Sequence, residues 1–94
     1  MLRVEMHDSV HTVIFRLQGR FTGDGAEQVR MLVIRCPVQM KLVVDLTEIS
    51  FIDSVGEEVL LFIRRFGGEF VAETSYTLDV CERLCLPLAH SGMS

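Results

Sequence analysis

The sequence predicts an α/β domain in which a single mixed β-sheet is covered by helices, with the elements in the order ββαβαβα. Residues 2–7 alternate apolar and polar side chains, which is the period-two pattern of a half-buried strand. Three later segments place apolar residues at helical spacing instead, and strand-like segments lie between them. Strands that alternate with helices after an opening hairpin imply right-handed crossovers and partly parallel pairing.

Two segments at the start of the chain predict the hairpin. After the alternating residues 2–7, residues 8–9 (DS) supply turn-forming side chains. Val10 to Leu17, VHTVIFRL, forms the second strand, because it is rich in β-branched and aromatic residues. Gly19 and residues 23–25 (GDG) are expected to break this strand pattern.

A first helix follows the glycines. Asp24 and Glu27 are spaced like a capping box at its start, and Pro37 ends it. Next, residues 41–46 (KLVVDL) contain a continuous apolar run, which suits a central strand covered on both faces. The apolar residues that share the inner face of the first helix are Val29, Leu32, Val33 and Cys36.

The second half of the chain predicts two more helices with a short strand between them. One helix runs from about Val55 to Phe66 and stops at Gly67-Gly68. Glu69 to Ala72 forms the short strand, and the last helix runs from about Tyr76 to Leu86. Residues 88–94 are expected to form a flexible tail. The inward-facing residues of the last helix are Val80, Cys81, Leu84 and Cys85.

Length and composition set the class of protein. With 94 residues, of which 49% are hydrophobic, residues 1–94 are expected to form one domain. The net charge of −4 argues against a nucleic-acid partner, because such proteins present basic surfaces to phosphates. No apolar run approaches the ~20 residues that a bilayer span needs, and the first residues lack the pattern of a signal peptide. We therefore expect a cytoplasmic protein that does not insert into membranes.

The sequence also argues against a metal, a cofactor or catalysis. The three cysteines Cys36, Cys81 and Cys85 are an odd number for a disulfide framework, so we expect small buried core residues. The histidines have no zinc-ligand spacing, and the glycine-rich loops that cradle phosphates are absent. No histidine stands in a motif with a nucleophile, so we expect no catalytic residues and no enzyme activity.

The stretch of residues 41–63, KLVVDLTEISFIDSVGEEVLLFI, resembles the signature of the STAS domain, the fold of anti-sigma factor antagonists. Its matching features are a buried strand that reaches Asp45, the apolar pair Phe51-Ile52, and Asp-Ser-x-Gly at residues 53–56 before a helix. The earlier VIFRLQGRF, residues 13–21, is similar to the second strand of that family and the turn after it.

This resemblance implies a protein-binding switch. In antagonists of the family, the serine after the aspartate is phosphorylated by a partner that is both an anti-sigma factor and a serine kinase, and only the unphosphorylated form binds that partner. The resemblance therefore implies phosphorylation of Ser54 in this chain. The partner-binding residues that it implies are Thr22, Asp53, Ser54, Val55, Gly56, Glu57 and Glu58.

Two other interpretations stay open at this point. Ser54 to Glu57 is also S-x-x-E before an apolar run, the capping-box signature, in which Ser54 serves only as a helix N-cap. STAS-like domains also act as constitutive subunits of transport or signalling complexes, where acidic Glu57-Glu58 would suit a basic patch on an ATPase or a regulator. The sequence leaves open which partner binds, whether a nucleotide binds, and whether the domain forms a homodimer.

Overall fold

The computed structural model describes residues 1–89, and their elements follow the predicted order ββαβαβα. Four strands form one mixed sheet in the order β1-β2-β3-β4. Strand β1 (Leu2–Asp8) pairs antiparallel with β2 (Thr12–Phe21). Strands β2 and β4 (Glu69–Val71) each pair parallel with β3 (Lys41–Ile52). The predicted mixed sheet is confirmed.

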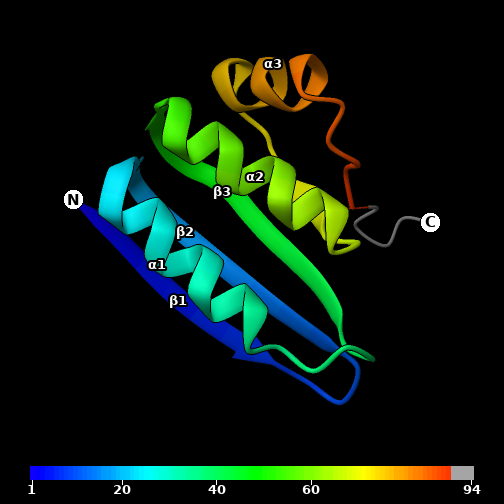
Figure 1. The fold of residues 1–94 in the computed structure, drawn as a ribbon. Coiled ribbons are helices and arrows are strands. Elements are labelled where there is room, and N and C mark those ends of the chain that lie inside the picture. Colours follow the sequence, from blue (N-terminus) through cyan, green and yellow to red (C-terminus); the bar gives the residue numbers. More distant parts are fainter. Residues whose placement is uncertain (90–94) are drawn as a thin grey trace.

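Two helices cover one face of this sheet. Figure 1 shows α1 (Gly23–Ile34) and α2 (Ser54–Arg65) side by side across the strands, with α3 (Ser75–Arg83) beyond them. None of these helices, within the described residues, has the length and apolar character needed to cross a membrane.

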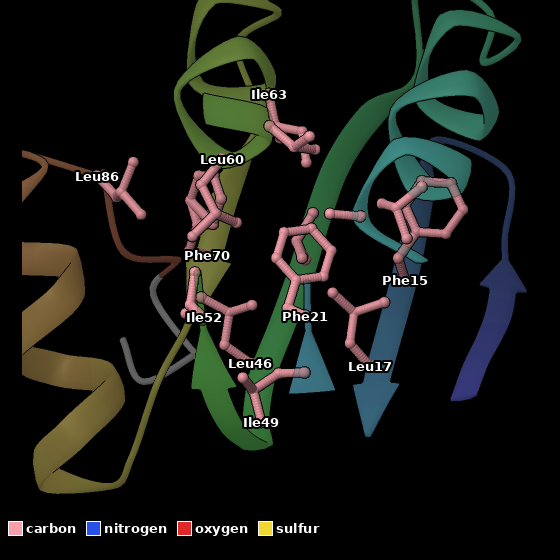
Figure 2. Packing of buried hydrophobic residues seen from close by; sticks show 14 of the residues in the cluster. Phe15, Leu17, Phe21, Leu46, Ile49, Ile52, Leu60, Ile63, Phe70 and Leu86 are labelled. Atoms are coloured by element: carbon pink, nitrogen blue, oxygen red, sulfur yellow. The ribbon is translucent and has the colours of Figure 1, made fainter. Parts of the chain in front are cut away.

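The hydrophobic core fills the space between the sheet and the helices. Figure 2 shows side chains of β2, β3 and α2 converging around Phe21, which is fully buried. Because burying one large apolar side chain contributes roughly 1.5–3 kcal/mol, this layer is the main source of stability. The fully buried members labelled in the figure are Phe15, Leu17, Phe21, Leu46, Leu60, Ile63 and Phe70.

Both central strands are longer than the sequence predicted. Strand β2 continues to Phe21, and β3 continues from Lys41 to Ile52. The prediction that Gly19 breaks the strand is wrong: its φ of +104° coincides with a shift in the β2–β3 register, which is a bulge within continuous pairing. A Cβ on Gly19 would also collide with the carbonyl oxygen of Met1. Glycine therefore preserves this strand.

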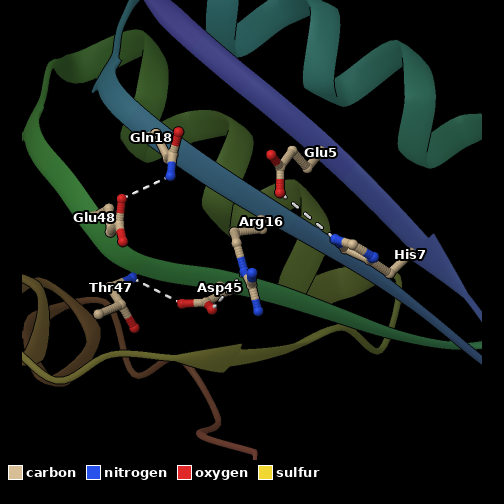
Figure 3. Close-up of polar contacts among 7 residues, drawn as sticks. All are labelled: Glu5, His7, Arg16, Gln18, Asp45, Thr47 and Glu48. Atoms are coloured by element: carbon tan, nitrogen blue, oxygen red, sulfur yellow. Dashed lines mark hydrogen bonds and ion pairs between the residues drawn. The ribbon is translucent and has the colours of Figure 1, made fainter.

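The face without these helices is polar. The apolar run of β3 is buried, at Leu42, Val43 and Val44. Helices α1 and α2 nevertheless cover only one face of the sheet, so the prediction that this strand is covered on both faces is wrong as far as helices are concerned. Figure 3 shows the polar contacts on the other face, among them the Arg16 guanidinium 3.7 Å from the Asp45 carboxylate. A shallow hollow of about 260 Å³ lies here, lined by Arg16, Gln18, Asp45, Thr47, Glu48, Val71 and Glu73.

Helix α1 begins without the predicted capping box. Thr22 is the N-cap, its side chain makes no capping hydrogen bond, and Asp24 lies inside the first turn. The Glu27 carboxylate accepts a hydrogen bond from Nε of Arg30 at 2.8 Å instead of returning to the start of the helix. A residue from a different loop supplies the missing acceptor, as described below.

Helix α3 ends earlier than predicted, at Arg83, through a Schellman motif. The N–H of Cys85 donates to the Glu82 carbonyl at 3.2 Å, and the N–H of Leu86 donates to the Cys81 carbonyl at 2.8 Å. Cys85 takes the left-handed position with φ +57°. Helix α2 ends in the same way, with Gly67 at φ +86°, so the predicted stop at Gly67-Gly68 is confirmed.

The early end of α3 changes the environment of the cysteines. Cys81 is buried as expected, and burial raises the pKa of its thiol. Cys36 is only half-buried and Cys85 is exposed, so the prediction of a buried core position is wrong for Cys85. The left-handed turn rotates Cys85 out of the helical face and lets Leu86 enter the core in its place.

The segment after α3 adds to the sheet. The N–H of Phe70 donates to the Pro87 carbonyl at 2.9 Å, and the N–H of Ala89 donates to the Phe70 carbonyl at 2.7 Å. Leu88 and Ala89, which belong to the expected flexible tail, lie beside β4 through this bridge. The rest of the expected tail, residues 90–94, lies outside the described residues.

The left-handed Cys85 generates a prediction. Replacing Cys85 with glycine should increase the free energy of unfolding by about 0.5–1 kcal/mol, because glycine accepts this backbone without a Cβ penalty. Cys85→Ala is the matched control, since it removes the thiol but keeps the Cβ. Urea unfolding of both variants measures the effect; equal stabilities of the two variants would show that the Cβ is not strained.

Candidate functional site

The residues of the Asp-Ser-x-Gly motif lie where the two central parallel strands end. Phe21 and Ile52, the last residues of β2 and β3, are register partners. Thr22 and Asp53 follow them, so the two loops leave the sheet at the same end of the strands. Figure 1 shows that α1 and α2 begin at this end. Loops at the carboxyl ends of parallel strands are a common place for functional residues.

The carboxylate of Asp53 binds the starts of both helices. Its Oδ1 accepts a hydrogen bond from the N–H of Gly56 at 2.8 Å, which makes Asp53 the N-cap of α2. Its Oδ2 accepts from the N–H of Gly23, the first residue of α1, at 3.2 Å. Negative charge is favoured at helix N-termini, and here one charge serves two of them. Asp53 therefore explains why α1 needs no cap of its own.

Ser54 lies one residue after the N-cap of α2. It is the first residue of α2 and is exposed, and its hydroxyl makes no hydrogen bond to any described residue. The interpretation of Ser54 as the helix N-cap is wrong, because the extended backbone of the capping position (φ −92°, ψ −173°) belongs to Asp53. Within residues 1–89 the Ser54 side chain is thus free of a structural hydrogen bond.

The next two residues of the motif hold α2 against the sheet. Gly56 is buried, and a Cβ there would collide with the Phe21 carbonyl oxygen and lie 2.8 Å from Cγ2 of Ile52. Val55 is half-buried and packs against the core cluster. The glycine is therefore required by close packing, which keeps the first turn of α2 pressed onto the strand ends.

The two glutamates of the motif have different environments. Oε2 of Glu57 lies 2.8 Å from Nη2 of Arg83, an ion pair that ties α2 to α3. The hydrogen bond and charge of Glu57 raise the pKa of Arg83. Glu58 is exposed. The second half of the expected capping box is therefore wrong as well, since Glu57 turns to α3 instead of back to the start of α2.

Other residues around the site were not predicted. The hydroxyl of Tyr76 accepts a hydrogen bond from the N–H of Ile52 at 2.8 Å, which fixes the end of β3 to α3. The Arg20 guanidinium lies 5.2 Å from the centre of the Phe51 ring, a cation–π contact. Phe51 is exposed whereas Ile52 is buried, so the strand period alone could have separated this apolar pair into two faces.

The family comparison agrees with this geometry. The model of the STAS domain matches residues 1–68, which include the motif and all of α2. The chain therefore belongs to the STAS domain family. None of the curated protein sequences matches it.

Several solved structures share the fold. One of them is the anti-sigma factor antagonist SpoIIAA in its unphosphorylated form, with a TM-score of 0.68 and 18% identity over 95% of this chain and 89% of that chain. Another is Mglu, with a TM-score of 0.59 and 23% identity over 74% of this chain. The match spans 19% of the Mglu chain. At these identities the likeness shows the α/β fold, including the order ββαβαβα.

The assignment of the cap to Asp53 makes a prediction about stability. Asp53→Ala should lower the free energy of unfolding by about 2 kcal/mol, because it removes a helix cap and leaves the Gly23 N–H without its acceptor. Ser54→Ala, one residue away, should change it by less than about 0.5 kcal/mol. Urea unfolding distinguishes the two residues. A large loss for Ser54→Ala with a small one for Asp53→Ala would reverse the assignment.

Proposed function

We propose that this domain is a regulatory protein-binding module similar to an anti-sigma factor antagonist, and that phosphorylation of Ser54 switches its binding. The partner would be a serine kinase that also acts as an anti-sigma factor. The observation that supports this most is the exposed hydroxyl of Ser54, which no described residue binds. A kinase needs an accessible acceptor, and capping by Asp53 leaves Ser54 available.

The surroundings of Ser54 favour an effect on the partner over a local rearrangement. Two nearby N–H groups that could bind a phosphate are already used: Gly56 donates to the Asp53 carboxylate, and Glu57 donates to the Asp53 carbonyl at 2.9 Å. A phosphate would add about −1.5 to −2 charges beside the carboxylates of Asp53 and Glu57. This charge would be directed outward, where desolvation and repulsion would break a partner interface.

Burial and internal contacts together divide the seven implied partner-binding residues into two groups. Ser54 and Glu58 are exposed, and the half-buried Thr22 and Val55 make no side-chain hydrogen bond or ion pair within residues 1–89, so these four residues would contact the partner. The others would position the loop: Asp53 through both helix starts, Gly56 through close packing, and Glu57 through Arg83. The proposed contact surface therefore spans the end of β2 and the first turn of α2.

A binding experiment with matched charge changes tests the switch. Wild type, Ser54→Ala, Ser54→Asp and Ser9→Asp would be used as baits in a lysate of the native host, with mass spectrometry to identify bound proteins. Ser9 is an exposed serine in the β1–β2 turn, so Ser9→Asp adds the same charge at the other end of β2. We expect a serine-kinase-like partner on every bait except Ser54→Asp, which should retain at least about tenfold less.

Equal retention by all four baits would overturn the switch. The domain would then be a constitutive subunit of a transport or signalling complex, and Glu58→Lys should release the partner. Titration of the purified partner with enzymatically phosphorylated domain gives the affinity difference directly.

A further inference from the structure

Strand β1 is an open edge of the sheet. It is seven residues long, pairs on one side only among residues 1–89, and its register with β2 runs without a bulge from Leu2 to Asp8. It contains neither proline nor lysine, which are common devices for protecting an edge. The other edge strand, β4, has only three residues, and residues Pro87–Ala89 pair with it on its outer side. Edge β1 is therefore suited to pair with another strand.

Hydrogen bonds at the two ends of β1 show which backbone groups face outward. The Met1 carbonyl accepts from Arg20 of β2, and the N–H of Ser9 donates to Thr12 at the start of β2. Backbone groups alternate between the two sides of a strand, so the odd-numbered residues face β2. The N–H and C=O groups of Leu2, Val4 and Met6 therefore point away from the sheet, with nothing paired to them within residues 1–89.

The side chains of β1 are self-complementary in one antiparallel register. Consider the β1 strands of two copies of this chain. With Val4 of one copy opposite Val4 of the other, Leu2 lies opposite Met6 of the second copy on the face toward the helices. On the other face, Arg3 lies opposite the partner's Glu5, and the pair occurs twice by symmetry. Met6 is 57% exposed, so this pairing would also cover an exposed apolar side chain.

Neighbouring registers are less favourable. A shift by one residue in each chain places Glu5 opposite the partner's Glu5 and Leu2 opposite the partner's Asp8. A further shift places Val4 opposite Asp8. Like charges or mixed apolar–acidic pairs weaken cross-strand pairing, whereas apolar and opposite-charge pairs stabilise it. The register centred on Val4 is therefore preferred.

We propose that two copies of this chain associate through antiparallel pairing of their β1 strands, centred on Val4. The two four-stranded sheets become one continuous sheet across the two-fold axis. Because only a few residues pair, the association is weak and depends on concentration. The Ser54 loops lie at the strand ends rather than on this edge, so both remain open to a partner.

Charge reversal tests the register through heterodimer rescue. Arg3→Glu alone places an acidic side chain opposite Glu5 of the second copy, twice by symmetry. Glu5→Arg alone places a basic side chain opposite Arg3 of the second copy in the same way. Each variant should associate about tenfold more weakly than wild type in sedimentation equilibrium. An equimolar mixture of the two should recover association, because the acidic side chains at positions 3 and 5 of one variant then lie opposite the basic side chains at positions 5 and 3 of the other.

The double variant Arg3→Glu/Glu5→Arg therefore completes the test. It restores an opposite-charge pair at both symmetric positions of its own homodimer, so its association should return to within about threefold of wild type. Arg65→Glu makes the same charge change as Arg3→Glu on an exposed residue of α2 and should have no effect. A double variant as weak as the single variants would overturn the register.

A second measurement does not depend on variants, which matters because Glu5 also lies opposite Arg16 and 3.6 Å from His7 within its own chain. In wild type, amide hydrogen exchange at Leu2, Val4 and Met6 should slow as the concentration rises, whereas Arg3 and Glu5 stay unchanged. A monomer at all concentrations, or protection without this alternation, would overturn the proposal. None of these outcomes depends on Ser54.

Discussion

The carboxylate of Asp53 is the interaction on which the arrangement of this domain depends most. It accepts hydrogen bonds from Gly56 in α2 and from Gly23 in α1, two amides that lie 33 residues apart in the chain (56 − 23). Two crossover helices that start from adjacent parallel strands need some means of aligning their first turns. A single shared acceptor does this, and the strand ends, the loops and both helices are then fixed relative to one another.

Because Asp53 is this shared acceptor, the structural role and the proposed functional role fall on two adjacent residues, Asp53 and Ser54. Since Asp53 caps α2, the Ser54 hydroxyl is exposed and makes no hydrogen bond within residues 1–89. The supporting contacts come from elsewhere in the chain: Gly56 allows α2 to approach Phe21, Tyr76 holds the N–H of Ile52, and Arg83 holds Glu57. The exposed serine thus lies where four elements, β2, β3, α2 and α3, are held together, which is a suitable basis for recognition by another protein.

Local patterns predicted much of the fold. Period-two alternation found β1, helical spacing found the three helices, and Gly67 marked the end of α2 through its left-handed backbone. The family motif also placed the candidate site at the start of α2. Long-range pairing extended β2 and β3 beyond their predicted ends, because a paired neighbour stabilises residues of weak strand propensity such as Gly19.

The failures of prediction at the site have a common cause. Aspartate and serine are both favoured N-cap residues, and at Asp53-Ser54 they are adjacent, so the spacing of the motif could not choose between them. The choice depends on Gly23, which is distant in sequence and offers a second donor to Asp53. The same is true of Glu57, whose partner Arg83 is 26 residues away. Such contacts are set by the tertiary fold, which the local pattern does not contain.

Amide hydrogen exchange at Gly23 and Gly56, compared between wild type and Asp53→Ala, tests the shared acceptor most directly. The structure predicts that exchange accelerates at both amides by about tenfold or more, while the mid-helix amides of Val29 and Val59 change much less. Acceleration at Gly56 alone would show that Asp53 is an ordinary cap of α2. Unchanged exchange at both amides would contradict the role given to Asp53, and with it the reason that Ser54 is free.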